Sequence, residues 1–430
     1  MAHLSPATVA ILIGAALVLP GNTQPREPVR VEIWKFDRLD RIGGHPTSLE
    51  GNPRVIETSL GPAVAFDGID DALFVETHPL AGAPTFTWEA VFRPEGGAEA
   101  QRWFHLQESG SENRMLLELR MLQGRWTLDA YLHSGEGQET LIDRDKLHPV
   151  LAWYHVAAVY DGRQFRSYVN GVEQDAASVP YAPQGAGRAS IGVRINRISY
   201  FKGSVHSARF TPRPIAPREF LEVTGLWKSV SFATDDGGVV HGDLYGSGNR
   251  GVVLVHGGRF NKASWAEQAY ALMKSGFMVL AIDLRGYGLS RGPGDADVSS
   301  APLHLDVRAA VRHLRTAGAT TVAVVGASLG GDAAANAALE GGPQDVDRLV
   351  LLAATPSRPL TALKIPSLFI VARDDASGDG PRLPGIRARY EEAPQPKELV
   401  LLDGDAHAQF LFATEQRDRV MRGIVRFLTN

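Results

Sequence analysis

The period of the hydrophobic pattern changes near residue 225, and this change constrains the fold more than any other feature of the sequence. Upstream, apolar and polar residues alternate over short runs that end at turn-forming residues. Downstream, short continuous apolar runs are followed by segments whose apolar residues share one helical face. The first pattern is typical of β-strands, and the second of strands that alternate with helices. The sequence therefore predicts two domains, an all-β sandwich and then an α/β domain with a mostly parallel sheet and helices on both faces.

Three segments illustrate the upstream pattern. In residues 86–92, apolar side chains alternate with Thr87 and Glu89, which predicts a half-buried strand. Residues 153–160 and 165–169 are predicted strands that end at Asp161-Gly162 and Asn170-Gly171. Both dipeptides favour the positive φ angles of tight hairpins, and many short strands of this kind indicate a sandwich.

Downstream, a capping box is expected where Ser264 is followed three residues later by Glu267, and the helix that it starts should end at Gly276. Further helices are predicted around residues 307–314 and 420–427. Short apolar runs predict the buried strands of a parallel sheet, at residues 252–255, 277–282, 321–325, 349–352, 367–371 and 399–402.

The first residues resemble an export signal. Residues 9–19 are uninterrupted and apolar, about the length of a signal-peptide core and too short to cross a bilayer comfortably. No later segment is apolar and long enough to be a membrane helix. We therefore predict an exported protein with this organisation: signal peptide 1–24, sandwich 28–215, linker 216–228 and α/β domain 229–430.

Composition excludes several classes of function. The net charge is −4, which argues against nucleic acid as a partner, because a dense positive charge on the protein favours nucleic-acid binding. Cysteine is absent, so disulfides, a thiol nucleophile and thiolate metal sites are ruled out.

The strongest motif is Gly326-Ala327-Ser328-Leu329-Gly330, directly after a predicted strand. A nucleophilic serine has to stand clear of a sheet on a sharp strand-to-helix turn. That turn crowds the positions two before and two after the serine, so glycine is favoured at Gly326 and Gly330. The placement predicts Ser328 as a nucleophile.

A second turn, His256-Gly257-Gly258, ends an earlier strand. Acyl transfer creates an oxyanion, and preset backbone N–H donors have to stabilise it. We expect one donor at Leu329, just after the nucleophile, and another at Gly258 or Arg259. His256 is expected to be structural.

A serine hydroxyl needs a base, and the base needs a carboxylate to hold its tautomer. His407 lies in the loop after the last predicted strand, which places it over the strand ends. Asp374 and Asp375 follow the preceding strand, and either could serve; we favour Asp375, since the neighbouring position usually points away. The chain order Ser, Asp, His is that of one hydrolase fold.

With these residues, positions 230–430 resemble the α/β-hydrolase superfamily. The resemblance implies that fold and a Ser-His-Asp hydrolase, but no substrate. Too few residues separate Leu352 from Ser367 for a cap domain, so the chain looks like compact dienelactone-hydrolase-like or esterase-like members with an open site. The resemblance is carried by His256-Gly257-Gly258, residues 283–290, the turn at Ser328, the pair Asp374-Asp375 and the loop of His407.

Residues 30–215 resemble the laminin-G-like, concanavalin A-like jelly roll, a family that often binds carbohydrate or protein, sometimes with calcium. His206 stands where relatives often carry an acid, which puts calcium in doubt. Trp103 and Trp126 are expected in the core rather than stacked on sugar rings. The resemblance is carried by Phe66-Asp67-Gly68, Asp70-Asp71, residues 86–92, Trp153-Tyr154-His155-Val156, Tyr168-Val169-Asn170-Gly171 and residues 191–210.

Asp67, Asp70 and Asp71 could supply oxygen ligands to calcium, but such carboxylates more often cap turns. No other cofactor is expected. We predict an exported carboxylic ester hydrolase that acts on a small or polymer-attached ester, with the sandwich as a targeting or ligand-binding module. Two alternatives stay open, a non-catalytic binding protein with a degenerate hydrolase scaffold, and a peptidase or amidase that uses the same three residues.

Overall fold

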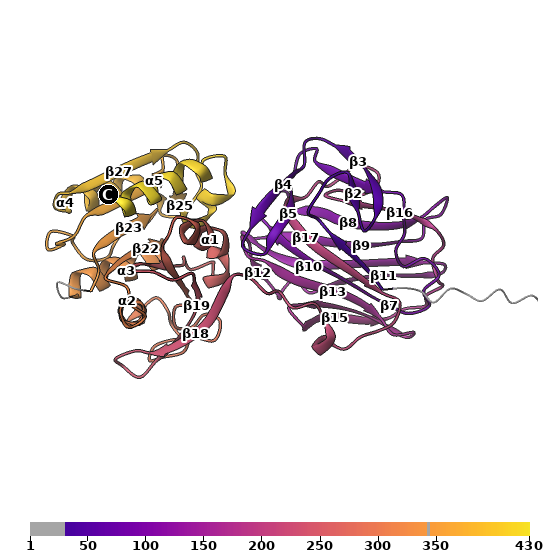
Figure 1. The fold of residues 1–430 in the computed structure, drawn as a ribbon, viewed down its shortest axis with the longest axis horizontal. Helices are drawn as coiled ribbons and strands as arrows, with labels where there is room; N and C mark the ends of the chain where they lie inside the picture. The colour runs from indigo at the N-terminus through magenta and orange to yellow at the C-terminus, as the bar shows by residue number, and fades with distance from the viewer. Residues whose placement is uncertain (1–30, 342–344) are drawn as a thin grey trace, which may run out of the picture.

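The computed structural model describes residues 31–341 and 345–430, so the predicted signal peptide lies outside the described residues. Two domains lie side by side, an all-β domain and a domain of strands and helices (Figure 1). The predicted combination of an all-β sandwich with an α/β domain is confirmed. In the described ranges, no helix combines the length and the apolar character needed to cross a membrane.

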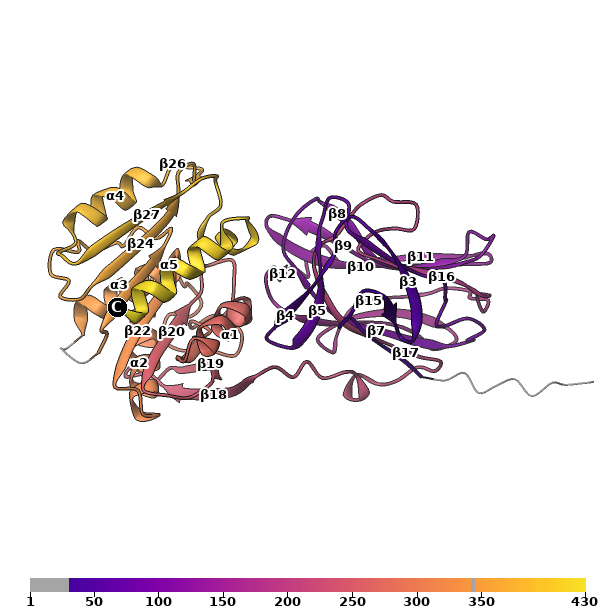
Figure 2. The same cartoon turned by 45° about the horizontal axis from the view of Figure 1, so that its top comes forward.

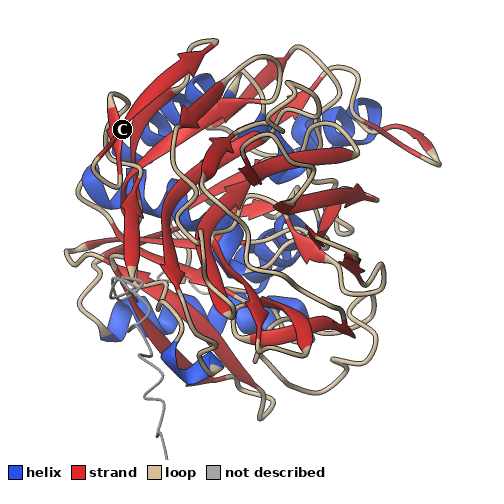
Figure 3. Ribbon diagram, turned by 90° about the vertical axis from the view of Figure 1, so that its right-hand side faces the viewer, coloured by secondary structure: helices blue, strands red, loops and turns tan. Residues whose placement is uncertain are grey.

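The first domain consists of two antiparallel sheets packed face to face, visible as two layers in Figure 2 and as the strand-rich front of Figure 3. Strand β1 (Glu32–Lys35) pairs with one sheet and β12 (His148–Pro149) with the other. One sheet has the order β15 (Val172–Ser178), β14 (Gln164–Val169), β13 (Tyr154–Tyr160), β7 (Phe86–Pro94), β17 (Lys202–Thr211), β5 (Gly61–Asp67), β4 (Arg54–Thr58). The other has the order β11 (Gly137–Ile142), β10 (Arg125–Ser134), β9 (Arg114–Leu122), β8 (Ala100–Glu108), β16 (Gly187–Ile191), β6 (Ala72–Val75), β3 (His45–Glu50), β2 (Arg41–Ile42).

Aromatic side chains fill the space between the two sheets. Trp103 and Trp126 are fully buried there, and both rings pack on Phe92, with centroids 4.2 and 5.0 Å away. The prediction that these tryptophans belong to the core is confirmed, and neither is available to stack on a sugar.

Strand β7 is buried on both faces, so the expectation of a half-buried strand was wrong. The segment after β17 explains the difference, because it crosses the outer face of the sheet. The Thr87 hydroxyl donates to the carbonyl of Arg213 and accepts from the N–H of Ile215, and the Glu89 carboxylate accepts from the N–H of Leu221. Polar side chains that would face solvent instead bind the backbone of this segment.

The second domain is built on a sheet that is parallel except at one edge. Strands β18 and β19 at this edge run antiparallel to their neighbours and were not predicted, whereas the other six fall where the apolar runs placed them. The order is β18 (Trp227–Ala233), β19 (Val239–Tyr245), β21 (Met278–Ile282), β20 (Arg250–Val255), β22 (Thr321–Ala327), β23 (Arg348–Leu352), β24 (Ser367–Ala372), β27 (Lys397–Leu402). Strand β18 begins at Trp227, two residues before the predicted start of the domain.

Helices flank this sheet (Figure 1). They are α1 (Ala266–Lys274), α2 (Leu303–Thr316), α3 (Leu329–Glu340), α4 (Leu383–Glu392) and α5 (Arg417–Thr429), with short helical turns η1 (Pro217–Glu219), η2 (Lys262–Trp265) and η3 (Ala408–Ala413) and a small ribbon β25 (Ala376–Ser377), β26 (Gly380–Pro381). Between β23 and β24 the chain forms no helix or strand, which agrees with the absence of a cap domain.

The predicted capping box does not form. Asn261 caps η2 instead, and the Ser264 hydroxyl donates to the carbonyl of Asn261. Glu267 points to the sandwich, where one carboxylate oxygen accepts from the hydroxyl of Ser59 (2.9 Å) and the indole N–H of Trp153 (2.8 Å). Glu267, which the sequence pattern placed in a local helix cap, therefore connects the two domains.

Candidate active site

Ser328 lies on the turn between β22 and α3, in a conformation that side-chain-bearing residues rarely adopt (φ 48°, ψ −114°). The close packing of this turn accounts for its glycines. A Cβ on Gly326 would lie 2.4 Å from the carbonyl oxygen of Gly330, and one on Gly330 would lie 2.5 Å from that of His256. Such a strained conformation costs about 1–3 kcal/mol and is typical of functional sites.

His407 connects Ser328 to a buried carboxylate. Its Nε2 lies 2.8 Å from the Ser328 hydroxyl oxygen, and its Nδ1 lies 2.8 Å from Oδ2 of Asp375. Since a carboxylate only accepts hydrogen bonds, Nδ1 carries the ring proton and Nε2 is left to accept from the serine. In this arrangement the imidazole can take the serine proton while the carboxylate holds the ring in place.

The two candidate acids have different positions. Asp375 is fully buried, and its Oδ1 lies 3.4 Å from Nε of Arg382, a residue that sequence reasoning missed. Asp374 is exposed, and its backbone N–H donates to the carbonyl of Gly404 in the loop before His407. The structure thus brings Asp375, and not Asp374, to the imidazole.

The expected oxyanion donors lie beside the serine. A Cβ on Gly257 would lie 3.5 Å from the Ser328 Cβ, and one on Gly258 would lie 3.7 Å from the Leu329 side chain. The backbone N–H groups of Gly258 and Leu329 have no acceptor among the described residues, and neither does that of Arg259. These groups are available to a ligand at Ser328.

The turn 256–258 is held by residues outside the predicted set. Gln409 is fully buried; its Oε1 accepts from the N–H of Gly257 (2.7 Å), and its Nε2 donates to the hydroxyl of Ser264 (2.6 Å). The hydroxyl of Tyr287 donates to the carbonyl of Gly258 (3.0 Å). A glutamine two residues after His407 carries no sequence signal of its own, whereas Tyr287 lies in the segment 283–290 already noted.

His256 has a structural position, as expected. It is fully buried, its Nδ1 donates to the carbonyl of Gly257 (2.9 Å), and its Nε2 accepts from the N–H of Leu284 (3.2 Å). Burial lowers the pKa of His256, which keeps the ring neutral. The ring therefore joins two backbone turns and makes no hydrogen bond to Ser328.

A cavity of about 500 Å³ opens at Ser328 and His407. The charged residues along its wall are two arginines, Arg259 and Arg382. Phe260, Tyr287 and Phe410 supply aromatic surface to the same wall. The cavity can hold a small organic group next to the serine, and its volume lies in the range of ordinary ligand sites.

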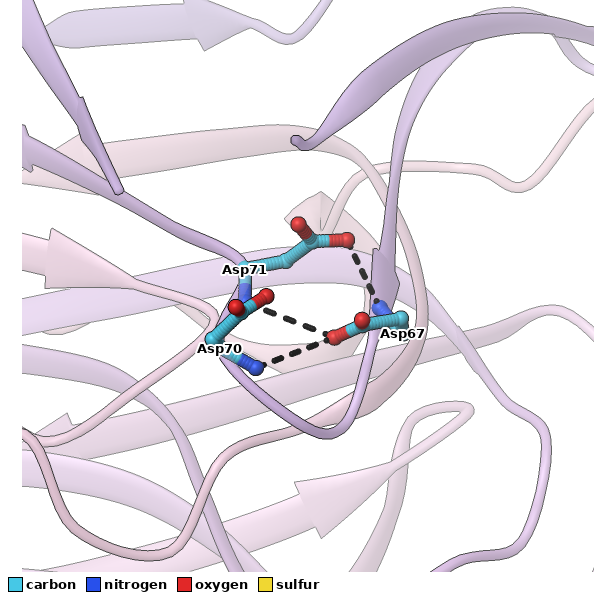
Figure 4. Close-up of side chains that lie close together, drawn as sticks. All are labelled: Asp67, Asp70 and Asp71. Carbon is cyan, nitrogen blue, oxygen red and sulfur yellow. Dashed lines mark hydrogen bonds between the residues drawn. The ribbon is translucent and has the colours of Figure 1, made fainter. Parts of the chain in front are cut away.

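The acidic cluster of the sandwich caps turns. Asp67 Oδ1 accepts from the N–H groups of Asp70 and Asp71, while Asp71 Oδ2 accepts from the N–H of Asp67 (Figure 4). Asp67 Oδ1 also accepts from the N–H of Ile69, and Asp71 Oδ1 accepts from that of Asn52. Ligand oxygens of the three aspartates lie within 4.8 Å of one another. Hydrogen bonds from backbone N–H groups account for the positions of these carboxylates, so we assign no metal to them. Burial raises the pKa of Asp71.

A second buried acid–histidine pair lies in the sandwich. Glu89 accepts from Nε2 of His155 (3.0 Å) and from Nε of Arg209 (2.5 Å). His155 also borders a cavity of about 570 Å³ along the linker, which is larger than the one at Ser328. Lys262 lines that cavity but forms an ion pair with Asp243, and no hydroxyl contacts the imidazole of His155 within the described ranges.

Fold and site together define a two-domain protein with a hydrolase scaffold in its second half. The family profiles agree: residues 67–219 match the laminin G family described as the concanavalin A-like lectin/glucanases superfamily, and residues 251–422 match the alpha/beta hydrolase fold family. The chain carries a laminin-G/concanavalin A-like domain followed by an α/β-hydrolase domain.

The chain is similar to several known proteins. An esterase of Exiguobacterium antarcticum is 16% identical, over 47% of this chain and 100% of that one, with a TM-score of 0.40. A dienelactone hydrolase of Anabaena variabilis is 23% identical, over 47% and 96%, with a TM-score of 0.40. A Synechocystis protein named "Putative non-heme chloroperoxidase" is 39% identical over 56 residues, 12% of this chain. The chain spans only 20% of that relative's length.

Proposed function

We propose that the protein hydrolyses carboxylic esters through an acyl-enzyme, with Ser328 as nucleophile, His407 as base and Asp375 as the orienting acid. The observation that carries the proposal is the pair of 2.8 Å contacts from His407 to the Ser328 hydroxyl and to the Asp375 carboxylate. The strained turn at Ser328 and the unpaired N–H groups beside it support the same conclusion.

The residues define the steps. Ser328 Oγ attacks the ester carbonyl carbon while its proton passes to His407 Nε2, and the N–H groups of Gly258 and Leu329 stabilise the oxyanion. The tetrahedral species collapses, the bond to the alcohol oxygen breaks, and His407 returns its proton to that alcohol. Water then attacks the acyl-enzyme with His407 again as base, which releases the acid and restores the hydroxyl.

Two measurements test this proposal. Ser328→Ala should abolish turnover of p-nitrophenyl acetate, and a fluorophosphonate should label Ser328 in the parent. Ser300→Ala, an exposed serine, serves as the matched control and should turn over like the parent. Turnover that survives Ser328→Ala contradicts the assignment. A parent that neither turns over nor labels favours the non-catalytic alternative, and a matching p-nitroanilide tests amide cleavage.

We also infer that the protein is exported. The inference rests on the apolar segment 9–19, whose length suits a signal-peptide core. Mass determination of the N-terminus of protein recovered outside the cytoplasm should give a chain that starts near residue 25. An intact N-terminus on cytoplasmic protein contradicts it.

A further inference from the structure

The loop that carries His407 contacts the sandwich directly. Phe410 and Ala413, both in η3, pack against the hydrophobic core of the sandwich. Lys202, on β17 of the sandwich, donates from Nζ to the carbonyl of Ala413 (2.8 Å). The segment that follows the proposed base is therefore held by the neighbouring domain as well as by its own.

The turn 256–258, on the other side of the cavity, is also anchored by the sandwich. Phe260, two residues after Gly258, is 3% exposed and belongs to the core cluster of the sandwich although it lies in the α/β domain. Its ring packs edge-on against Phe410, with centroids 4.9 Å apart. The turn of the expected oxyanion donors and the loop of His407 thus meet on the sandwich surface.

A tight hairpin of the sandwich reaches this meeting point. Strands β9 and β10 are joined by Gln123 and Gly124, both at positive φ (53° and 74°), as two-residue hairpin turns require. A Cβ on Gly124 would lie 3.1 Å from Cζ of Phe410 and 3.3 Å from a guanidinium nitrogen of Arg259. Phe410 and Arg259 both line the cavity at Ser328.

Because Gly124 has no side chain, the hairpin can approach these two residues closely. We propose that the β9–β10 hairpin fixes the wall of the ester site formed by Phe410 and Arg259, so that Gly124 limits the size of the substrate group bound there. The inference rests on the proposed ester hydrolysis. It gives the sandwich a part in substrate selection: in a hydrolase domain without a cap, the adjoining domain bounds one side of the site.

The test uses the full-length chain and two glycines of the same domain. Gly124→Asn adds a side chain at a φ that asparagine tolerates, and it pushes on Phe410 and Arg259. Gly110→Asn is the matched control, since Gly110 lies in the neighbouring β8–β9 hairpin at a φ of 69° with nothing within 4 Å of its Cβ position. Phe410→Ala makes the opposite change, because it enlarges the cavity on that side.

The readout is kcat/KM for p-nitrophenyl esters of increasing acyl length and for acetates of increasingly bulky alcohols. In at least one series, Gly124→Asn should lower kcat/KM for the large members about tenfold relative to the smallest, a typical effect of pocket size. Phe410→Ala should favour the large members, and Gly110→Asn should keep the parent's profile.

Fluorophosphonate labelling of Ser328 in every variant separates two kinds of failure. No labelling and no turnover in the parent overturns the proposed hydrolase itself. Full labelling with an unchanged size profile in both Gly124→Asn and Phe410→Ala overturns the role of the hairpin and leaves the hydrolase intact. If Gly124→Asn does not fold, the smaller change Gly124→Ala and the Phe410→Ala profile decide the matter in the same way.

Discussion

Among the residues that the structure describes, two buried carboxylates each bind a histidine, one in each domain. In the sandwich, Glu89 holds His155 at 3.0 Å in the middle of a sheet; in the α/β domain, Asp375 holds His407 at 2.8 Å at the ends of parallel strands. Both carboxylates are fully buried. The chemistry of the two pairs is similar, so the pair alone does not make a catalytic site.

The surroundings make the difference. The His155 side chain is 4% exposed, and its ring packs 5.2 Å from that of Phe220 in the linker. The His407 side chain is 26% exposed and has a serine hydroxyl on its second nitrogen. A parallel sheet brings the ends of its strands to one edge, where loops can place distant residues together, whereas the flank of a β-strand is covered by whatever crosses it.

The largest expected effect separates the two histidines. His407→Ala should lower kcat for an ester about 10⁴-fold or more, because the serine loses its base. His155→Ala should leave kcat within about twofold and destabilise the fold by ~1–3 kcal/mol, the cost of an unpaired buried group. Steady-state kinetics and urea unfolding measure both. Comparable losses of kcat in the two variants would contradict the different roles of His407 and His155.

The next effect separates two neighbouring acids. Asp375→Asn should lower kcat about 10⁴-fold, since an amide favours the wrong tautomer of the imidazole. Asp374→Asn should have little effect, because that side chain is exposed and only its backbone contacts the loop before His407. Kinetics on the same ester decides it. If Asp374→Asn proves the more damaging change, the assignment of the acid is wrong.

A stability effect tests the structural pair. Glu89→Ala should lower the free energy of unfolding by about 3 kcal/mol, since it leaves Arg209 and His155 without a buried partner. The exposed Glu136→Ala should change it little. Burial raises the pKa of Glu89, but hydrogen bonds from His155, Arg209 and the N–H of Leu221 outweigh it and lower the pKa overall.

The sign of that pKa shift fixes the pH dependence. A carboxyl group whose pKa is lowered by folding stabilises the native state above its unfolded pKa, about 4.3, and loses that contribution as pH falls through the folded value. The parent should therefore lose more stability than Glu89→Ala between about pH 5 and pH 3. Urea unfolding across this range measures it, and parallel curves for the two proteins would show that the carboxylate contributes nothing.

The smallest effect concerns a residue that supports the site without entering it. Gln409→Ala should lower kcat about tenfold, because the turn of Gly257 and Gly258 loses one of its supports, at a cost of ~1–2 kcal/mol. Gln409→Glu keeps the acceptor oxygen but not the donor to Ser264, so it should recover part of the rate. A kcat equal to the parent's in Gln409→Ala would show that Tyr287 alone holds the turn.

The α/β domain could be predicted in outline because its inner strands are buried on both faces and form unbroken apolar runs. The edge strand β27 is only half-buried, but it too contains an apolar run, at residues 399–402. Ser328, His407 and Asp375 each follow such a run, so all three lie at the same edge of the sheet. This placement does not depend on the helices that connect the strands. The edge strands β18 and β19 were missed, since half-exposed antiparallel strands resemble the sandwich pattern.

Contacts between distant segments were beyond sequence reasoning. Glu267 follows Ser264 at the spacing of a capping box, but its partners are Ser59 and Trp153, more than a hundred positions away. The burial of Glu89 depends on the linker that crosses β7, and the role of Gln409 depends on a turn 152 residues away. Each is fixed by tertiary packing, which leaves no periodic trace in the local sequence.

Phe260 has a consequence for how such a protein can be rearranged. Its ring belongs to one domain by sequence and to the core of the other by packing, so a cut in the linker would leave this ring without the core that buries it. An α/β domain transplanted onto another carrier would expose this aromatic surface beside Ser328. Exchange of modules would need a recipient that matches this surface, so the two halves should be inherited and engineered as a pair.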